Sequence, residues 1–254
     1  MSTIRIEPDD VVGLFEDGMT IGIGGWGSRR KPMSIVRALV RSGVRNLTIV
    51  SFGGPDVGIL CATGQVHRVV HGFVTLDSIP IDPHFAAARE AGSIETLELD
   101  EAMLIAGLRA AARRVPFEVT RSGLGSDAVL KNAGIREIDS PYDDGERLVA
   151  MPAIALDVAL LHADRADANG AAQCLGDDAH VDDLFASAAA TTIVAAAEIV
   201  PTASLLSSHS PLTLHLNRTM VNHVVESPQS VGFTANPPIS PRDERLQRAY
   251  ADAA

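Results

Sequence analysis

Short runs of consecutive apolar residues alternate along this chain with longer segments in which apolar residues recur every three or four positions. Runs such as Leu47–Val50 and Thr191–Ala196 are typical of strands buried on both faces of a parallel sheet. Helical spacing begins after Pro32, which suits the first turn of a helix, and after Asp100, a common type of helix cap. This alternation predicts an α/β fold with an open, mostly parallel sheet flanked by helices.

The expected elements follow one another without a repeat. We expect strands at 19–23, 47–50, 66–73, 94–99, 117–120, 147–151, 158–161 and 191–196, and helices at 8–15, 32–42, 57–62, 84–91, 101–114 and 182–189. Mixed patterning over 122–142 predicts a loop or a small lobe. From about residue 227 the chain is rich in Pro, Ser and Arg. We therefore predict one domain over 1–254, with a C-terminal tail that wraps around the body or extends from it.

Composition and charge restrict the possible partners. The chain has 254 residues, of which 46% are hydrophobic and 21% charged, as in ordinary globular proteins. Its formal net charge of -11 argues against a general nucleic-acid binder, since few cations are available to neutralise phosphates. The sequence contains no run of about eighteen apolar residues, so we predict no membrane span. The N-terminus lacks the apolar core of a signal peptide.

Cysteine and histidine usage gives no sign of a disulfide framework or a metal centre. Cys61 and Cys174 stand alone, without a CxxC pair, which predicts a reduced, cytoplasmic protein. No HExxH motif is present, and His67 and His71, four apart, fall on a predicted strand. We predict no metal site.

A glycine-rich turn joins the first predicted strand to the first long helix, within Asp17–Pro32 (DGMTIGIGGWGSRRKP). Such a turn bends sharply or approaches a ligand closely, so it could cradle a nucleotide phosphate, aim bare N–H groups at an acyl oxygen, or be purely structural. It contains GxGxxG spacing. The next strand, Leu47–Val50, is not followed by the acidic residue that would hold a ribose, because the first acid is Asp56, beyond a Gly-Gly-Pro turn. A nucleotide site is therefore the weakest of the three interpretations.

The same segment resembles the signature of the α subunits of class I coenzyme A transferases. That signature reads Asp-Gly, a few apolar or small residues, Gly-Gly-Phe, three residues of any kind, Gly, any residue, Pro. Here Trp26 stands for the Phe and Arg30 for the last Gly. Two later segments, His162–Gly170 and Asp183–Ala189, resemble later family motifs in the same order, and the resemblance spans roughly Arg5–Val225. It implies the family fold, an acyl-CoA substrate without a further cofactor, and a separate β subunit in an α2β2 assembly.

One position distinguishes two activities within this family. Where transferase α subunits usually carry Pro-Gln-Gly-Thr, this chain has Asp100-Glu101-Ala102-Met103. The acidic pair, together with GWGSRRKP and RSGLGS from Arg121, resembles the α subunits of actinobacterial hydrolases that cleave a ring of cholesterol-derived CoA thioesters, although these have Gly where this chain has Ala102. That resemblance implies hydrolytic (retro-Claisen) cleavage of a carbon–carbon bond, with Glu101 as the catalytic residue. The alternative is a transferase α subunit, whose partner β subunit forms a glutamyl-CoA thioester.

Elementary chemistry allows the same role for Glu101. A glutamate at a helix N-terminus is ordinarily stabilised in its ionised form by the helix dipole. In a partly dry cleft, burial would instead raise its pKa and make it a base. It could activate water to attack a ketone β to a thioester, and the released enolate would need donors. The backbone N–H groups of Gly24, Gly25 and Trp26 are the predicted oxyanion donors.

The remaining candidates are basic or hydroxyl side chains. Arg121 follows the strand after the Glu101 helix, so both residues could face one sheet edge, with Arg121 clamping a carboxylate or enolate. Arg29, Arg30 and Lys31 could bind CoA phosphates or substrate carboxylates, and Ser28 is a further possible donor. For the basic residues, a solvated surface position is the competing interpretation. A third hypothesis is a non-catalytic α/β module, which would be stable alone and bind a ligand without turnover.

Overall fold

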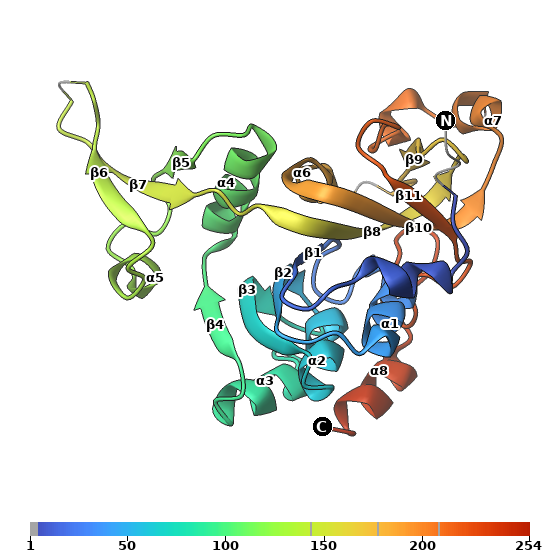
Figure 1. Cartoon of the computed structure of the whole chain (residues 1–254), viewed down its shortest axis with the longest axis horizontal. Coiled ribbons are helices and arrows are strands. Elements are labelled where there is room, and N and C mark those ends of the chain that lie inside the picture. Colours follow the sequence, from blue (N-terminus) through green and yellow to red (C-terminus); the bar gives the residue numbers. More distant parts are fainter. Residues whose placement is uncertain (1–4, 143, 177, 208) are drawn as a thin grey trace.

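A parallel sheet forms the centre of the molecule (Figure 1). The computed structural model describes residues 5–142, 144–176, 178–207 and 209–254. Within them the strands of the central sheet follow the order β11-β10-β8-β1-β2-β3-β4, and every neighbouring pair on this path is parallel. These strands are β1 (Thr20–Ile23), β2 (Leu47–Gly53), β3 (Val66–Val74), β4 (Glu95–Glu98), β8 (Leu156–Ala166), β10 (Ala189–Ile199) and β11 (His223–Glu226), and β9 (Ala172–Gln173) pairs antiparallel with β8. The predicted α/β fold with an open, mostly parallel sheet is confirmed.

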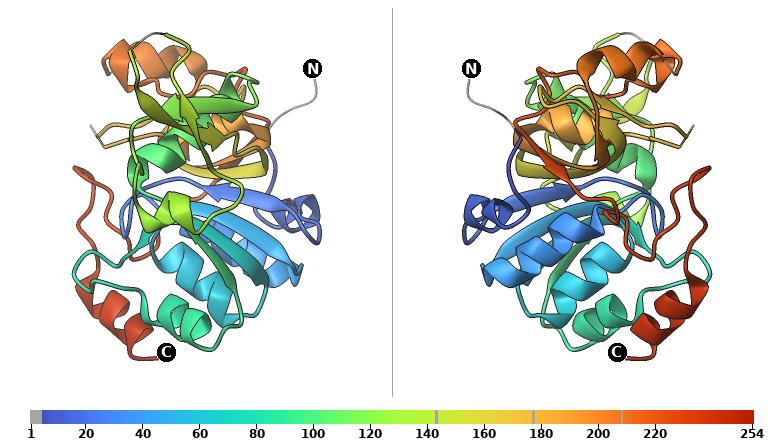
Figure 2. Two further views of the ribbon diagram at one scale, coloured as in Figure 1. Left: turned by 90° about the vertical axis from the view of Figure 1, so that its left-hand side faces the viewer. Right: turned by 90° about the vertical axis from the view of Figure 1, so that its right-hand side faces the viewer.

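Helices cover both faces of this sheet and enclose two cores (Figure 2). One face packs against α1 (Met33–Ser42), α2 (Pro55–Ala62) and α3 (Pro83–Glu90). The opposite face packs against α4 (Glu101–Ala112) and α6 (Asp182–Ala188), which also contact each other. Smaller elements are η1 (Asp10–Leu14), α5 (Asp127–Leu130), α7 (Thr202–Ser207), η2 (Pro211–Thr213) and α8 (Glu244–Ala251). The helix expected at 8–15 is thus only a short 3-10 turn.

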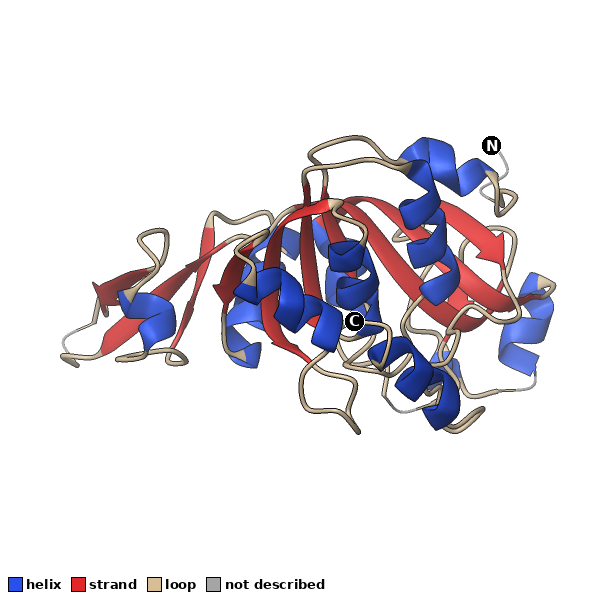
Figure 3. Cartoon of the chain, turned by 90° about the horizontal axis from the view of Figure 1, so that it is seen from below, coloured by secondary structure: helices blue, strands red, loops and turns tan. Residues whose placement is uncertain are grey.

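A small lobe projects from one end of the molecule (Figures 1 and 3). Its sheet has the order β5-β7-β6, formed by β5 (Phe117–Thr120), β7 (Arg147–Pro152) and β6 (Arg136–Asp139), and both pairings are antiparallel. The lobe expected at 122–142 contributes α5 and β6. The strands expected at 117–120 and 147–151 exist, but they belong to the lobe. Positions of greater and lesser exposure alternate along both strands, as in an antiparallel sheet with one solvated face.

The C-terminal tail packs against the body and ends in α8. The Gln247 side chain is fully buried, donates to the Leu76 carbonyl oxygen and to Ser78 Oγ at 2.8 Å each, and accepts from Ser28 Oγ at 2.5 Å. Tyr250 donates its hydroxyl to Asp82 Oδ2 at 2.7 Å. These contacts support the proposal that 1–254 form one domain.

Candidate active site

The carboxyl ends of β1, β2 and β3 bring three aromatic rings together, where ligands usually bind in open α/β sheets. Trp26 follows β1 and stacks on Phe52 of β2 with ring centroids 4.5 Å apart and planes 20° apart. Phe73 of β3 meets Trp26 edge-on at 5.2 Å. Trp26, Phe52 and Phe73 are called the aromatic floor below. Offset and edge contacts of this kind hold rings firmly, so the floor is a rigid apolar surface at the sheet edge.

Glu101 lies beside this floor, at the first position of α4. The carboxylate of Asp100 caps the helix by accepting the Met103 N–H at 2.8 Å, as predicted. A Cβ on Gly72 would lie 3.3 Å from the Phe52 ring and 3.5 Å from Glu101 Cγ, so the glutamate arm crosses β3 at a residue without a side chain. Glu101 is exposed. In this chain its side chain is therefore open to solvent and to a ligand.

The glycine turn does not offer free N–H donors. Gly24 N–H donates to the Leu160 carbonyl at 2.9 Å, and Trp26 N–H donates to the Arg29 carbonyl at 3.0 Å. Gly25 N–H donates to Asp182 Oδ1 at 2.9 Å. Internal acceptors already occupy all three groups in this chain, so the arrangement does not support the oxyanion role expected for them. The glycines instead allow close packing: a Cβ on Gly24 would lie 2.5 Å from Asp182 Oδ1, and Gly25 has a φ of 76°.

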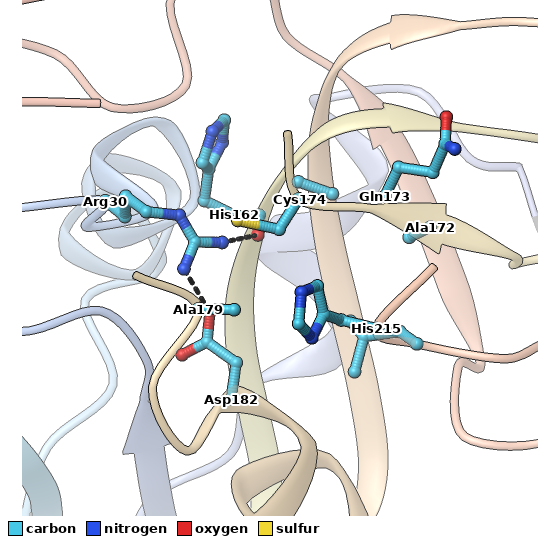
Figure 4. Close-up of a pocket in the computed structure, with 10 residues that line it drawn as sticks. Arg30, His162, Ala172, Gln173, Cys174, Ala179, Asp182 and His215 are labelled. Carbon is cyan, nitrogen blue, oxygen red and sulfur yellow. Dashed lines mark hydrogen bonds and ion pairs between the residues drawn. The ribbon is translucent and has the colours of Figure 1, made fainter. Parts of the chain in front are cut away.

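Two of the predicted substrate-binding side chains lie in the interior. Ser28 is fully buried under α8, where it bonds to Gln247. Arg30 is 2% exposed, donates to the carbonyls of Asp178 and His162 at 3.2 Å each, and pairs with Asp182 at 3.2 Å (Figure 4). Burial lowers the pKa of Arg30, but Asp182 and neighbouring carboxylates outweigh it and leave that pKa raised. Contact of these side chains with CoA is not supported by this arrangement.

The neighbouring basic residues differ in access. Arg29 retains 36% exposure of its side chain and forms an ion pair with Asp77 at 3.4 Å. Lys31 is fully buried; its ammonium donates to the Phe52 carbonyl at 2.8 Å and pairs with Asp56 at 3.2 Å. Burial lowers the pKa of Lys31, and Asp56 partly offsets that effect. Arg29 is thus the basic side chain of this turn that a ligand can reach, whereas Lys31 holds the end of β2.

Arg121 lies on the lobe rather than on the edge of the central sheet. Its guanidinium binds both carboxylate oxygens of Glu146, at 2.5 and 3.0 Å, and its side chain is 76% exposed. It lines a groove of the lobe together with Tyr142. The expectation that Arg121 and Glu101 face one sheet edge is therefore wrong, because β5 belongs to the other sheet. The next residue, Ser122, does donate to Asp100 Oδ2 at 2.6 Å, which fastens the lobe beside the start of α4.

His180 is a site residue that the sequence did not reveal. It is exposed, has a φ of 46°, and lies two residues before α6. Its imidazole ring lies 4.7 Å from the Trp26 ring. Only the fold brings these two residues together. The spacing of histidines along the sequence bears on metal binding and did not indicate that His180 lies beside Trp26.

A buried polar cluster lies behind the turn. Ser230 Oγ is 2.5 Å from His162 Nδ1, and His162 Nε2 is 3.4 Å from Asp164 Oδ1. The order resembles a Ser–His–Asp relay, yet all three side chains are nearly inaccessible. The adjoining cavity, about 10 Å³ and lined in part by Arg30 and Cys174, has room for about one water. These groups bind the C-terminal segment to β8 rather than a substrate.

Among the described residues, no group of three or more His, Cys, Asp or Glu side chains is arranged to hold a metal ion. No helix in the described part of the chain is long and apolar enough to span a membrane.

A model of the coenzyme A transferase family matches residues 6–227. The chain belongs to the coenzyme A transferase family. It is 49% identical to the cholesterol ring-cleaving hydrolase IpdA subunit of Rhodococcus jostii, over 98% of this chain and 86% of that protein. Identity to the IpdA subunit of Mycobacterium tuberculosis H37Rv is also 49%, over 98% of this chain and 88% of the relative.

A solved structure shows the same fold. Glutaconate coenzyme A-transferase from Acidaminococcus fermentans superposes with a TM-score of 0.88 at 24% identity, over 98% of this chain and 84% of that one. The family and fold inferred from the glycine turn and the two later motifs are therefore confirmed.

Proposed function

We propose that this chain is the α-type subunit of a CoA-thioester hydrolase that opens a steroid-derived ring by retro-Claisen cleavage in cholesterol breakdown. The observation that carries the proposal is the 49% identity, over 98% of the chain, to subunits named for cholesterol ring cleavage. Coenzyme A enters as part of the substrate, and no separate cofactor is required.

Glu101 supplies the proton chemistry in this proposal. Its carboxylate takes a proton from water, and the resulting hydroxide attacks a ring ketone β to the thioester. The bond between the ketone carbon and the α-carbon breaks, and its electron pair passes to the thioester enolate. Glu101 then returns the proton to the α-carbon, so the net change is addition of one water. The position of Glu101 beside the aromatic floor supports this role.

A second chain completes the enzyme. The hydrolase relatives are named as subunits, so we propose a β-type partner and an α2β2 assembly. Light scattering, which measures the mass of the complex in solution, tests this assembly. A cytoplasmic location is also proposed, since Cys61 and Cys174 are both free thiols in the interior.

The test is a single substitution in the assembled complex. Glu101→Gln keeps the size of the side chain and removes the base, so kcat for ring hydrolysis should fall by about 10²–10⁴, while the acyl-CoA still binds. Glu95→Gln, on the exposed strand β4, is the matched control and should leave kcat unchanged. Undiminished turnover in Glu101→Gln rejects the assignment.

A transferase α subunit remains the alternative, because the family and the fold are those of CoA transferases. In that case the partner chain would form a covalent thioester with CoA, and Glu101 would be dispensable. Mass spectrometry of the β-type chain after incubation with acyl-CoA separates the two. A CoA adduct that borohydride reduces favours transfer, whereas ring opening without an adduct favours hydrolysis.

A further inference from the structure

The enolate formed in the proposed reaction needs a hydrogen-bond donor, and the glycine turn does not provide one. Its three N–H groups are bonded to Leu160, Asp182 and Arg29. Arg121 lies on the lobe and binds Glu146. A group on another element beside the aromatic floor meets this need.

We propose that His180 fills this role by donating a ring N–H to the thioester oxygen on which the enolate charge develops. The inference rests on the proposed function and adds a catalytic residue to it. His180 is exposed, and its ring lies 4.7 Å from the Trp26 ring at 32° between the planes. It stands just before α6, which packs beside α4, the helix that begins with Glu101.

The spacing of the strands gives an approximate distance between Glu101, the base, and His180, the donor. Glu101 lies against Gly72 of β3, whereas His180 lies against Trp26, which follows β1. Neighbouring strands are about 4.8 Å apart, so the two side chains approach from positions about 10 Å apart across the floor. That separation leaves room for a water on Glu101 and for a ring ketone β to a thioester whose oxygen accepts from His180.

Partial burial favours the neutral form of the His180 ring. Burial lowers its pKa most, the carboxylates of Asp178 and Asp182 raise it, and the guanidinium groups of Arg29 and Arg30 lower it again, with a net decrease. A neutral imidazole can still polarise a carbonyl oxygen by donating one N–H, and stabilises the enolate without giving up the proton. Proton transfer remains with Glu101.

The backbone at His180 is held in an uncommon conformation. Its φ of 46° is left-handed, a conformation that non-glycine residues rarely adopt. Contacts on both sides keep it there: the Asp178 carbonyl accepts from Arg30, and Asp182 accepts from Gly25 N–H. Such strain persists where the surroundings enforce it, and here they fix the imidazole over Trp26.

The first test removes the ring nitrogens and keeps a ring. In the complex assembled with its β-type partner, His180→Phe should lower kcat about 10²–10³-fold, the usual loss for one oxyanion donor. KM should change by no more than about threefold, because the donor acts in the transition state. His84→Phe is the matched control: His84 packs against Tyr250 at 4.6 Å, away from the floor, and its loss should leave kcat unchanged.

The second test uses the left-handed backbone. Glycine adopts positive φ freely, so His180→Gly should fold and lose activity, and added imidazole should restore part of kcat. A His180→Phe enzyme with wild-type kcat, or a His180→Gly enzyme that imidazole does not rescue, overturns the inference. If Glu101→Gln is inactive while His180→Phe is normal, the proposed function stands and this inference fails. If the wild-type complex opens no ring, both fail.

Discussion

At the scale of single residues, Asp182 joins the turn, the arginine behind it and α6. One carboxylate oxygen accepts Gly25 N–H at 2.9 Å, and the other lies 3.2 Å from Arg30. Both charged side chains are buried, so either one alone would be an uncompensated charge in the interior. The pair fixes the turn that carries Trp26 and leaves the solvent side of the site to Glu101 and His180.

Asp164 gives a pH-dependent prediction. Burial alone would raise the pKa of its carboxyl, but His162, the Leu175 N–H and Asn236 outweigh that effect and lower the pKa to about 2. A carboxyl whose pKa is depressed on folding stabilises the protein above its unfolded pKa, and that stability is lost as the pH falls through the folded value. Asp164→Asn should therefore lower the free energy of unfolding by about 2 kcal/mol at neutral pH.

Urea unfolding of both proteins across the acid range checks this. The difference between wild type and Asp164→Asn should shrink between about pH 4 and pH 2, where the wild-type carboxyl takes up its proton. A difference that stays constant down to the lowest pH would contradict the prediction.

The sequence correctly predicted that Glu101 begins a helix, because the evidence for that was local. The cap Asp100 and the apolar spacing after it define the start of α4. The hydrogen bonding of the glycine turn, in contrast, depends on residues distant in the sequence. The acceptors of its N–H groups include Leu160 and Asp182, which only the fold brings near, so a glycine run could not show whether its donors were free. For the same reason, no pattern in the sequence marked His180.

At the scale of elements, α8 turns the polar tail into part of the body. Its Tyr250 reaches Asp82, and both lie against Gly58 of α2, which has no side chain there. The Pro- and Ser-rich composition of the tail indicates little burial, so its sequence did not show whether the tail wraps around the body or extends from it. The helix nevertheless buries Gln247, whose amide finds three polar partners.

Gly58→Ala should loosen this contact. An added Cβ would overlap the Tyr250 hydroxyl and the Asp82 carboxylate, so we expect a loss of about 1–3 kcal/mol from overpacking. Hydrogen exchange should become faster in α8 than in α1. Gly13→Ala is the control, since a Cβ there meets nothing within 4 Å. Equal stability of the two variants would show that α8 adapts without cost.

At the scale of the whole molecule, the α/β alternation was sufficient to predict the central sheet. Parallel strands covered by helices contain short apolar runs, and β8 contains such a run at Val158–Leu161. The same alternation did not show that β5 and β7 leave the sheet, because a short strand has the same local pattern in either sheet. Which sheet a strand joins depends on pairing partners that are distant in the sequence.

Trp26 is the single tryptophan of the chain, which makes the site visible by fluorescence. Its ring touches His180, and a protonated imidazole quenches indole emission. Because the pKa of His180 is lowered by burial, emission should stay high through neutral pH and fall only below 6.5, the ordinary value. His180→Gln should abolish the transition, and a midpoint above 6.5 would contradict the assignment. All tryptophan fluorescence of this chain therefore comes from the aromatic floor. Binding of acyl-CoA can be followed by the change in that fluorescence, without a label.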